Sequence, residues 1–298
     1  MNMLNFFHVQ KSFGAKQVLR DVTFCVPEHT VFGFVGQNGA GKTTAMKLAL
    51  GLLPMDKGEI LVNGEAVRYG NTVTNRFVGY LPDVPEFYSF LTPAEYLRFC
   101  GEITGMPDRE IMLRSEEMLQ LVGLDKEKRR IKGFSRGMKQ RLGIAQALLN
   151  RPRLLICDEP TSALDPAGRK ELLDILAAAK EQTTVLFSTH ILSDVEHICS
   201  ELAFLHKGKI ALKGSLTEIK SMHRAAATEL ELERREDIKA LMHVFSYLEP
   251  AGGSCLRLGN PERLPEVLHF LADGRIPIQR IERLEPTLED LFMEVIGK

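Results

Sequence analysis

The chain has no tryptophan, only five cysteines, no long apolar run and almost no net charge. The cysteines are scattered and odd in number, and none belongs to a Cys-x-x-Cys or His-x-Cys cluster. This pattern argues against a disulfide framework. We expect reduced, mostly buried thiols at Cys25, Cys100, Cys157, Cys199 and Cys255.

The missing apolar run and the balanced charge exclude further classes. No segment approaches the roughly 20 apolar residues of a membrane-spanning helix, and the first residues lack the basic start and apolar core of a signal peptide. The 38 Lys and Arg nearly balance the 39 Asp and Glu, so no global charge favours nucleic acid or an anionic membrane. We expect a cytoplasmic protein without a nucleic acid partner, and its 298 residues suffice for one large domain or two.

Short apolar segments alternate with helical patterns from about residue 2 to residue 215, which predicts an α/β core with a mainly parallel sheet. The runs 154–157 and 184–187 are continuously apolar, as central strands covered on both faces are. Polar residues follow both runs, at the sheet edge where such folds bind ligands. Between about residues 85 and 150 the pattern is helical, so we predict an inserted helical subdomain.

The sequence pattern changes after residue 215, which predicts two domains. These are residues 1–218 and a small α+β extension at residues 219–298. Alternating and helical patterns follow each other in this extension, and Thr287 with Asp290 resembles a capping box before the last helix. The predicted strands and helices of the extension are residues 228–232, 254–258, 261–272 and 288–296.

Residues 36–43, GQNGAGKT, fit the phosphate-binding pattern Gly-x-x-x-x-Gly-Lys-[Ser/Thr] and follow the apolar run 31–35. Glycines let such a loop fold with its N–H groups pointing inward, and the following helix adds its positive dipole end. We expect Lys42 to reach the outer phosphates of a nucleoside triphosphate and Thr43 to bind Mg2+. The candidate nucleotide-binding residues are Gly36, Gln37, Asn38, Gly39, Ala40, Gly41, Lys42, Thr43 and Thr44.

Asp158 and Glu159 directly follow the strand predicted at residues 154–157. Side chains alternate along a strand, so the two carboxylates point in different directions. We expect Asp158 to face the Mg2+ shell and Glu159 to orient or deprotonate a water in line with the γ-phosphate. In a P-loop protein we favour this interpretation over a solvated acidic turn before Pro160.

Residues 134–141, FSRGMKQR, lie upstream of that strand and resemble the signature sequence of the ATP-binding cassette (ABC) family. Residues 162–165, SALD, resemble its D-loop, and residues 188–190, STH, resemble its switch histidine motif. These elements stand in the order of the family and span about residues 2 to 215. The chain is identified by this resemblance as similar to ABC ATPases.

The resemblance implies that two cassettes pair head to tail, so that the signature of one closes over the ATP of the other. The alternative for this segment is an ordinary helix capped by a serine. The signature residues that would face the partner's ATP are Phe134, Ser135, Arg136, Gly137 and Met138.

Further site residues follow from the same resemblance. Glu159, His190 and Lys42 would be catalytic, with His190 at the γ-phosphate, and Asp165 would belong to the D-loop. Phe13 matches the position where the family stacks an aromatic ring on adenine, although a core aromatic is the alternative.

The chain departs from the family pattern at two places. Where the family often has LSGGQ, this chain keeps only Ser135 and Gly137 of the central positions. Where a glutamine usually touches Mg2+, Asp83 stands after residues 77–82. We expect Asp83 to keep the metal role beside Thr43 and Asp158.

The resemblance implies the ATP-hydrolysing subunit of an ABC transporter, peripheral on the cytoplasmic face of the membrane through separate permease subunits. A second ABC subunit, most simply another copy of the chain, would be its dimer partner. Residues 284–292, LEPTLEDLF, resemble the tail of exporter ATPases for drugs, antibiotics and peptides, which favours export. The alternatives are a soluble ABC clamp on ribosomes or DNA, or a regulator that does not hydrolyse ATP.

Overall fold

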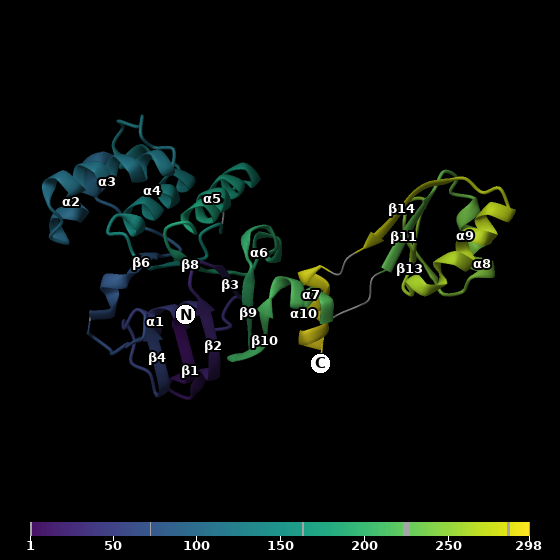
Figure 1. Cartoon of the computed structure of the whole chain (residues 1–298), viewed down its shortest axis with the longest axis horizontal. Helices are drawn as coiled ribbons and strands as arrows, with labels where there is room; N and C mark the ends of the chain where they lie inside the picture. The colour runs from purple at the N-terminus through teal and green to yellow at the C-terminus, as the bar shows by residue number, and fades with distance from the viewer. Residues whose placement is uncertain (1, 72, 163, 223–226, 285–286, 298) are drawn as a thin grey trace. The chain divides into compact units, whose positions relative to one another are not determined.

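The chain divides into two compact units, Met1–Leu216 and Thr217–Lys298, each described here by itself (Figure 1). The boundary that we predicted from the sequence, after residue 218, falls within helix α7 (Leu216–Met222). This computed structural model describes residues 2–71, 73–162, 164–222, 227–284 and 287–297.

A ten-stranded sheet forms the body of the first unit, in the order β5-β4-β1-β2-β10-β9-β3-β8-β7-β6. The expected α/β fold is confirmed. The strands are β1 (Asn2–Phe13), β2 (Lys16–Pro27), β3 (Val31–Val35), β4 (Lys57–Val62), β5 (Glu65–Ala66), β6 (Val78–Leu81), β7 (Leu154–Asp158), β8 (Thr184–Thr189), β9 (Glu201–His206) and β10 (Lys209–Ser215).

The sheet is parallel from β9 to the edge strand β6, and β10 is also parallel to β2. Strands β6, β7, β8, β3 and β9 are parallel neighbours, and all residues of β3, β7 and β8 are buried. Strands β1, β2 and β4 pair antiparallel, which the expectation of a mainly parallel sheet did not include. For β1 and β2 the reason is the tight turn at Gly14, with φ of 57°, because strands joined by a short turn can only pair antiparallel.

Three helices form the predicted helical subdomain between the neighbouring strands β6 and β7, and Figure 1 shows them grouped together. They are α2 (Pro93–Ile103), α3 (Asp108–Leu121) and α4 (Arg136–Leu148). Helix α2 begins with a capping box, in which Glu95 N–H donates to Thr92 Oγ1 and Thr92 N–H donates to Glu95 Oε2. The remaining helical segments of this unit are α1 (Lys42–Ala49), α5 (Pro166–Ala179), α6 (Leu192–Ile198) and the 3-10 turns Val73–Phe77 and Ile131–Gly133.

Phenylalanine rings fill the core of the sheet in a chain that has no tryptophan. The Phe24 ring stacks on Phe6, Phe32 and Phe34 with centroid distances of 4.6, 5.8 and 5.0 Å. All four side chains are at most 3% exposed. The cluster holds β1 and β2 against β3, the strand that leads into the GQNGAGKT loop.

The second unit has the order strand, helix, strand, strand, helix, strand, with an antiparallel sheet ordered β12-β13-β11-β14. This is the split βαβ arrangement of ferredoxin-like folds. Leucines of the sheet, among them Leu230 and Leu256, pack against Val267 and Leu271 of α9. The elements are β11 (Ala227–Leu232), α8 (Asp237–Val244), β12 (Leu248–Gly252), β13 (Cys255–Leu258), the 3-10 turn Pro261–Arg263, α9 (Leu264–Asp273) and β14 (Ile278–Leu284), followed by α10 (Leu288–Gly297).

The four elements expected in this extension are present. The capping box is present too, with Asp290 N–H donating to Thr287 Oγ1 at 3.2 Å and Thr287 N–H to Asp290 Oδ2 at 3.1 Å. The sequence did not predict α8, β12 or β14. Strand β12 contains Pro250 and Gly252, which weaken a strand pattern and are tolerated here because β12 is an edge strand.

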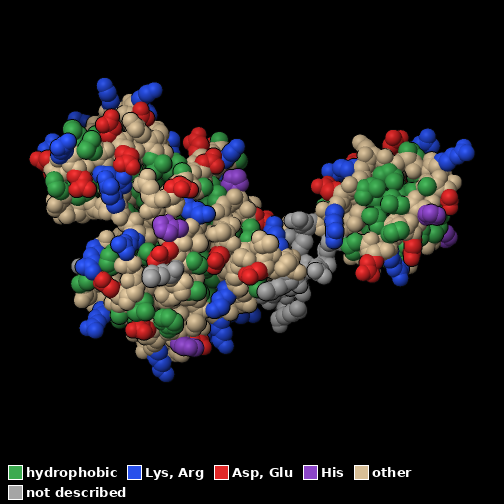
Figure 2. Space-filling model, viewed as in Figure 1, with side chains coloured by type: hydrophobic (Ala, Val, Ile, Leu, Met, Phe, Trp, Pro, Cys, Tyr) green, Lys and Arg blue, Asp and Glu red, His purple; other side chains and the backbone are tan. Residues whose placement is uncertain are grey.

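Lys, Arg, Asp and Glu side chains are intermixed on the face of the first unit that Figure 2 shows. The five cysteines are free, but only Cys157 and Cys199 are buried, and Cys25 is exposed. Among the described residues, no helix has both the length and the apolar character needed to cross a membrane.

Candidate functional site

The loop between β3 and α1 has the predicted phosphate-binding geometry. Helix α1 begins at Lys42, and Gly41 precedes it as the N-cap with φ of 112°. A Cβ on residue 41 would lie 2.8 Å from Leu19 Cδ2, so both conformation and space require glycine there. The Lys42 Nζ atom donates to the carbonyls of Gly36 and Gln37 at 2.6 and 3.3 Å, which folds the loop around the amine.

A groove of about 640 Å³ lies over this loop. It is bordered by the loop, by the turn between β1 and β2, and by the residues that follow β6, β7 and β8. Its lining residues are Phe13, Lys16, Val18, Asn38, Gly39, Gly41, Lys42, Thr43, Thr44, Asp83, Glu159, Ser162 and His190.

Three predicted catalytic residues contact one another in this groove. Glu159 Oε1 lies 2.9 Å from Lys42 Nζ, and Glu159 Oε2 lies 2.8 Å from His190 Nδ1. The Glu159 side chain is 14% exposed, and its backbone has φ of 49°, a left-handed conformation that non-glycine residues rarely adopt. Such strain is typical of functional sites, and here it turns the carboxylate away from β7 toward Lys42.

Asp158 is the last residue of β7, directly before Glu159, and is 2% exposed. Ser188 Oγ, on the neighbouring strand β8, donates to Asp158 Oδ1 at 2.6 Å. The same Oγ accepts from the Glu159 N–H at 3.0 Å, and the Ser188 carbonyl accepts from that N–H at 3.1 Å. Ser188 therefore holds both acidic residues in place.

The sequence predicts no separate role for Ser188, which stands within the STH motif. The available signal was a polar residue at the end of an apolar strand, next to the strand that carries the acid pair. Its contacts depend on the parallel pairing of Asp158 with Ser188, which the sequence alone does not specify.

A second buried contact was also missed. Thr161 Oγ1 donates to Asp194 Oδ2 at 2.6 Å and connects the turn after β7 to helix α6, which follows His190. Both side chains are at most 2% exposed. Burial raises the pKa of the Asp194 carboxyl above its usual range, and the hydrogen bond from Thr161 partly offsets this.

The residues of the predicted signature lie outside the lining of the groove, as does Asp165 of the predicted D-loop, whereas Ser162 of the D-loop lines it. Ser135 is the N-cap of α4, where its Oγ accepts from the Met138 N–H at 3.2 Å. Asp165 is the N-cap of α5 and accepts from the Gly168 N–H at 3.1 Å. Each of these side chains therefore caps a helix, and the proposed contact of the signature with a partner's ATP stays a prediction.

Two predicted residues lie at the rim. Phe13 is 49% exposed and lines the groove, whereas the nearby Phe6 is 1% exposed and belongs to the core. Lys16, which sequence reasoning missed, pairs with Phe13 across the turn. Asp83 also lines the groove, and its Oδ1 accepts from Ser162 Oγ at 2.7 Å.

The donor set fits a magnesium nucleotide. Mg2+ in such sites takes one or two protein oxygens and leaves its other positions to phosphates and water. Thr43 lines the groove, and Asp158 is buried directly before the lining residue Glu159, so the chain offers a hydroxyl and a carboxylate of this kind. Lys42 and the positive end of α1 supply the charge that phosphates require.

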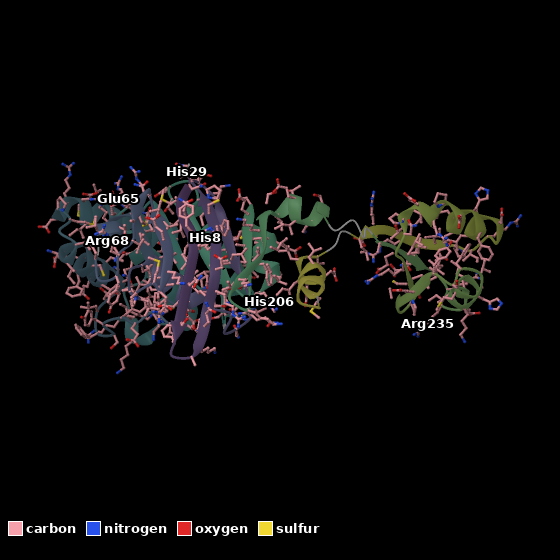
Figure 3. All side chains as sticks on the ribbon, turned by 90° about the horizontal axis from the view of Figure 1, so that it is seen from below. His8, His29, Glu65, Arg68, His206 and Arg235 are labelled. Carbon is pink, nitrogen blue, oxygen red and sulfur yellow. The ribbon has the colours of Figure 1, made fainter. Side chains whose placement is uncertain are left out.

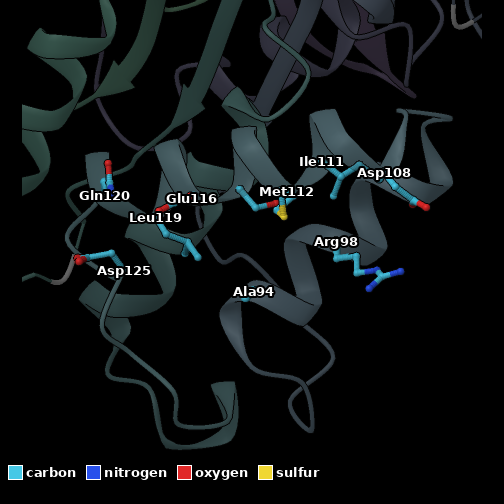
Figure 4. A pocket seen from close by; sticks show the side chains of 10 residues that line it. Ala94, Arg98, Asp108, Ile111, Met112, Glu116, Leu119, Gln120 and Asp125 are labelled. Atoms are coloured by element: carbon cyan, nitrogen blue, oxygen red, sulfur yellow. The ribbon is translucent and has the colours of Figure 1, made fainter.

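A second groove of similar volume lies between α2 and α3 (Figure 4). Its lining includes Ile111, Met112 and Leu119, and it contains none of the predicted site residues. The histidines that Figure 3 labels on the first unit, His8, His29 and His206, do not line the nucleotide groove either.

Comparison with known proteins places this geometry in a family. The family model described as ABC transporter matches residues 19–162. The chain is 36% identical over 305 aligned residues to the uncharacterized ABC transporter ATP-binding protein YxlF of Bacillus subtilis (strain 168), covering 99% of each chain. The chain belongs to the ABC transporter ATP-binding protein family. As a member of this family it binds ATP and is an ATPase.

Further relatives of this ABC protein extend the comparison over both units. It is 34% identical to the bacitracin transport ATP-binding protein BcrA of Bacillus licheniformis, with 96% of this chain and 95% of the relative covered. The model described as ATP-binding protein DrrA1-3-like, C-terminal domain, matches residues 214–296. A solved structure titled as the ATP binding subunit of an ABC transporter is 34% identical, with a TM-score of 0.66 over 74% of this chain and 92% of that chain. The resemblance and the fold class predicted from the sequence are both confirmed.

Proposed function

We propose that this ABC ATPase hydrolyses MgATP in the groove over the GQNGAGKT loop and thereby drives transport through separate membrane subunits. The observation that carries the proposal is the contact of Glu159 with both Lys42 and His190, at 2.9 and 2.8 Å. It places a carboxylate, a cation and an imidazole together at the end of a phosphate-binding loop.

The roles of the residues follow from this contact. When bound, MgATP supplies the γ-phosphoryl group and the metal charge that stabilises it. Glu159 orients a water and accepts its proton on a carboxylate oxygen. His190 holds the Glu159 carboxylate through Nδ1, and Lys42 supplies positive charge beside the loop carbonyls. Thr43 and Asp158 hold Mg2+, with Ser188 fixing the Asp158 carboxylate, and Asp83 is a third candidate ligand at the rim.

The partners follow from the family. The chain pairs with a second ABC subunit, most simply another copy, so that residues 134–138 of one subunit and the groove of the other enclose each ATP. Permease subunits hold the pair on the cytoplasmic face of the membrane. The bacitracin transport relative supports export of an antibiotic or peptide, and the names of the relatives favour a transporter over a ribosome or DNA clamp.

Phosphate release from MgATP by the wild type and by the Glu159→Gln variant tests this function. Removing a general base lowers turnover by roughly 100- to 10,000-fold. We expect the variant to keep ATP binding and to accumulate as an ATP-bound dimer in size-exclusion chromatography. Glu181→Gln, an exposed residue outside the groove lining, is the matched control and should turn over like the wild type. Equal turnover of wild type and Glu159→Gln would refute the assignment of the base.

Transport itself requires a second experiment. The chain is co-expressed with ABC permease subunits chosen as candidate partners, and efflux of a labelled antibiotic peptide is followed in cells. We expect efflux with the wild type and none with Glu159→Gln. Comigration of the chain with ribosomes or DNA, and not with membranes that contain the permease, would support the clamp instead.

A further inference from the structure

One face of helix α4 holds the segment that follows β6. Arg136 and Gln140 are four residues apart and therefore share a face of the helix. Gln140 Nε2 donates to the Asp83 carbonyl at 2.6 Å, and an Arg136 guanidinium N–H donates to Asp83 Oδ1 at 3.4 Å. A single residue of the segment is thus bound through its backbone and its side chain to one helix.

The packing behind these contacts leaves little freedom. A Cβ on Gly143, in the next turn of α4, would lie 2.4 Å from Leu81 Cδ1 and 3.5 Å from Pro85 Cβ. The segment on both sides of Asp83 is therefore in close contact with the helix. Gln140 is fully buried, so its hydrogen bond to the Asp83 carbonyl is shielded from water.

Ser162 adds a third element to this contact. Its Oγ donates to Asp83 Oδ1 at 2.7 Å, and Arg136 donates to the same Oγ at 3.3 Å. The Ser162 N–H donates to the carbonyl of Glu159 at 3.1 Å. Arg136, Asp83 and Ser162 thus form a polar triad that joins the start of α4 to the turn carrying Glu159.

The charges of the triad are matched. Asp83 brings a second carboxylate into a groove that already contains Glu159 and is built for an anionic ligand. Left alone, this carboxylate would repel phosphates. Arg136 places a permanent positive charge on it. Asp83 and Arg136 are also two of the positions where the chain departs from the residues expected in the loop after β6 and in the signature.

We propose that Arg136 is a positioning residue that acts through Asp83, holding its carboxylate on Ser162 and cancelling its charge at the rim of the nucleotide groove. Residues 83 and 136 are then a functional pair, and each tolerates its unusual identity only in the presence of the other. This inference rests on the proposed function, since it assigns the pair a role in binding and hydrolysing ATP.

A double-mutant cycle with Arg136→Gln and Asp83→Asn tests the pair. The first readout is the affinity for the fluorescent analogue MANT-ATP in the presence of Mg2+. Arg136→Gln leaves the Asp83 charge unopposed, and we expect it to weaken binding about fivefold, within the range of couplings measured for contacting residues. Adding Asp83→Asn should restore the affinity to within about twofold of Asp83→Asn alone, the scatter expected when two effects are fully coupled. Arg136→Lys keeps the positive charge, so it should weaken the affinity for MANT-ATP less than Arg136→Gln does.

The controls separate this role from general damage. Arg98 and Glu102 form an exposed ion pair at 2.8 Å on α2, in the same subdomain and outside the groove lining. The variants Arg98→Gln and Glu102→Gln should leave binding and turnover unchanged, singly and together. Circular dichroism spectra of all variants should match the wild type.

Turnover is measured in the same samples as a second readout. If the effects of Arg136→Gln and Asp83→Asn on binding multiply in the double variant, Arg136 does not act through Asp83, and the proposal is overturned. Unchanged binding in Arg136→Gln would overturn it as well. A wild type that binds MANT-ATP without releasing phosphate would instead contradict the proposed function, and the binding cycle would still decide the role of the pair.

Discussion

Ser188→Ala tests whether a buried hydroxyl holds the two acidic residues of the site. The variant removes the donor to Asp158 Oδ1 at 2.6 Å and one of two acceptors for the Glu159 N–H. The second acceptor, the Ser188 carbonyl at 3.1 Å, remains. The loss therefore falls mainly on the Asp158 carboxylate, which is 2% exposed and cannot turn to water instead.

The magnitude follows from these contacts. A hydrogen bond to a charged group contributes about 1.5–3 kcal/mol, and a buried acceptor left without a donor keeps the full cost of its desolvation. We expect the variant to lose about 2 kcal/mol in the opening free energy of β7. Turnover should fall by about 10-fold because small displacements of a catalytic group reduce rates strongly, while KM changes less since Lys42 and the loop are intact.

Native-state hydrogen exchange with peptide resolution is the appropriate assay for stability. The chain has no tryptophan to report unfolding, and peptides distinguish the first unit from the second. Thr184→Val is the matched control, since Thr184 lies at the other end of β8 and its Oγ1 accepts from the His29 N–H at 3.0 Å. It should lose stability without losing turnover. A Ser188→Ala variant with unchanged exchange in β7 and unchanged turnover would refute the reasoning.

Two further predictions concern the buried acid and the second unit. Because burial raises the pKa of Asp194, its contribution to stability is fully present below pH 3.8 and is lost as the pH rises through the folded pKa. Urea unfolding of the wild type and of Asp194→Asn at several pH values tests this. The free energy of unfolding of the wild type should fall relative to that of the variant from acid to neutral pH. Parallel curves of unfolding free energy against pH would contradict this. Leu230 is fully buried in the core of the second unit. Its substitution by alanine should lower the free energy of unfolding of this unit by about 2–5 kcal/mol. Hydrogen exchange should rise in peptides of the second unit while turnover stays at the wild-type value, and a loss of turnover would show that the units are coupled.

The chemistry of the site could be predicted because it is encoded in short segments. The GQNGAGKT loop and the pair Asp158 and Glu159 each follow an apolar strand, and parallel strands bring such ends to one edge of the sheet. The cap of α4 by Ser135 and the box of Thr287 with Asp290 were equally visible, since a cap depends on residues three positions apart.

The rest depends on pairings between distant segments. Ser188 and Asp194 acquire their roles only when β8 lies beside β7 and α6 lies beside the turn after Glu159. The contact of Arg136 with Asp83 joins residues 53 positions apart, and no local pattern signals it. The antiparallel strands at the start of the chain were missed because alternation alone does not state which neighbour a strand takes.

The ferredoxin-like fold of the second unit begins and ends at one place. Ala227, the first residue of β11, pairs with Leu284, the last residue of β14. The polypeptide therefore enters and leaves this fold through adjacent, antiparallel strands, so that the two ends of the fold lie side by side. Insertions with neighbouring ends can be gained, exchanged or deleted without displacing the segments on either side. The paired ends of β11 and β14 thus make this βαββαβ module a piece that can be exchanged or deleted as one unit.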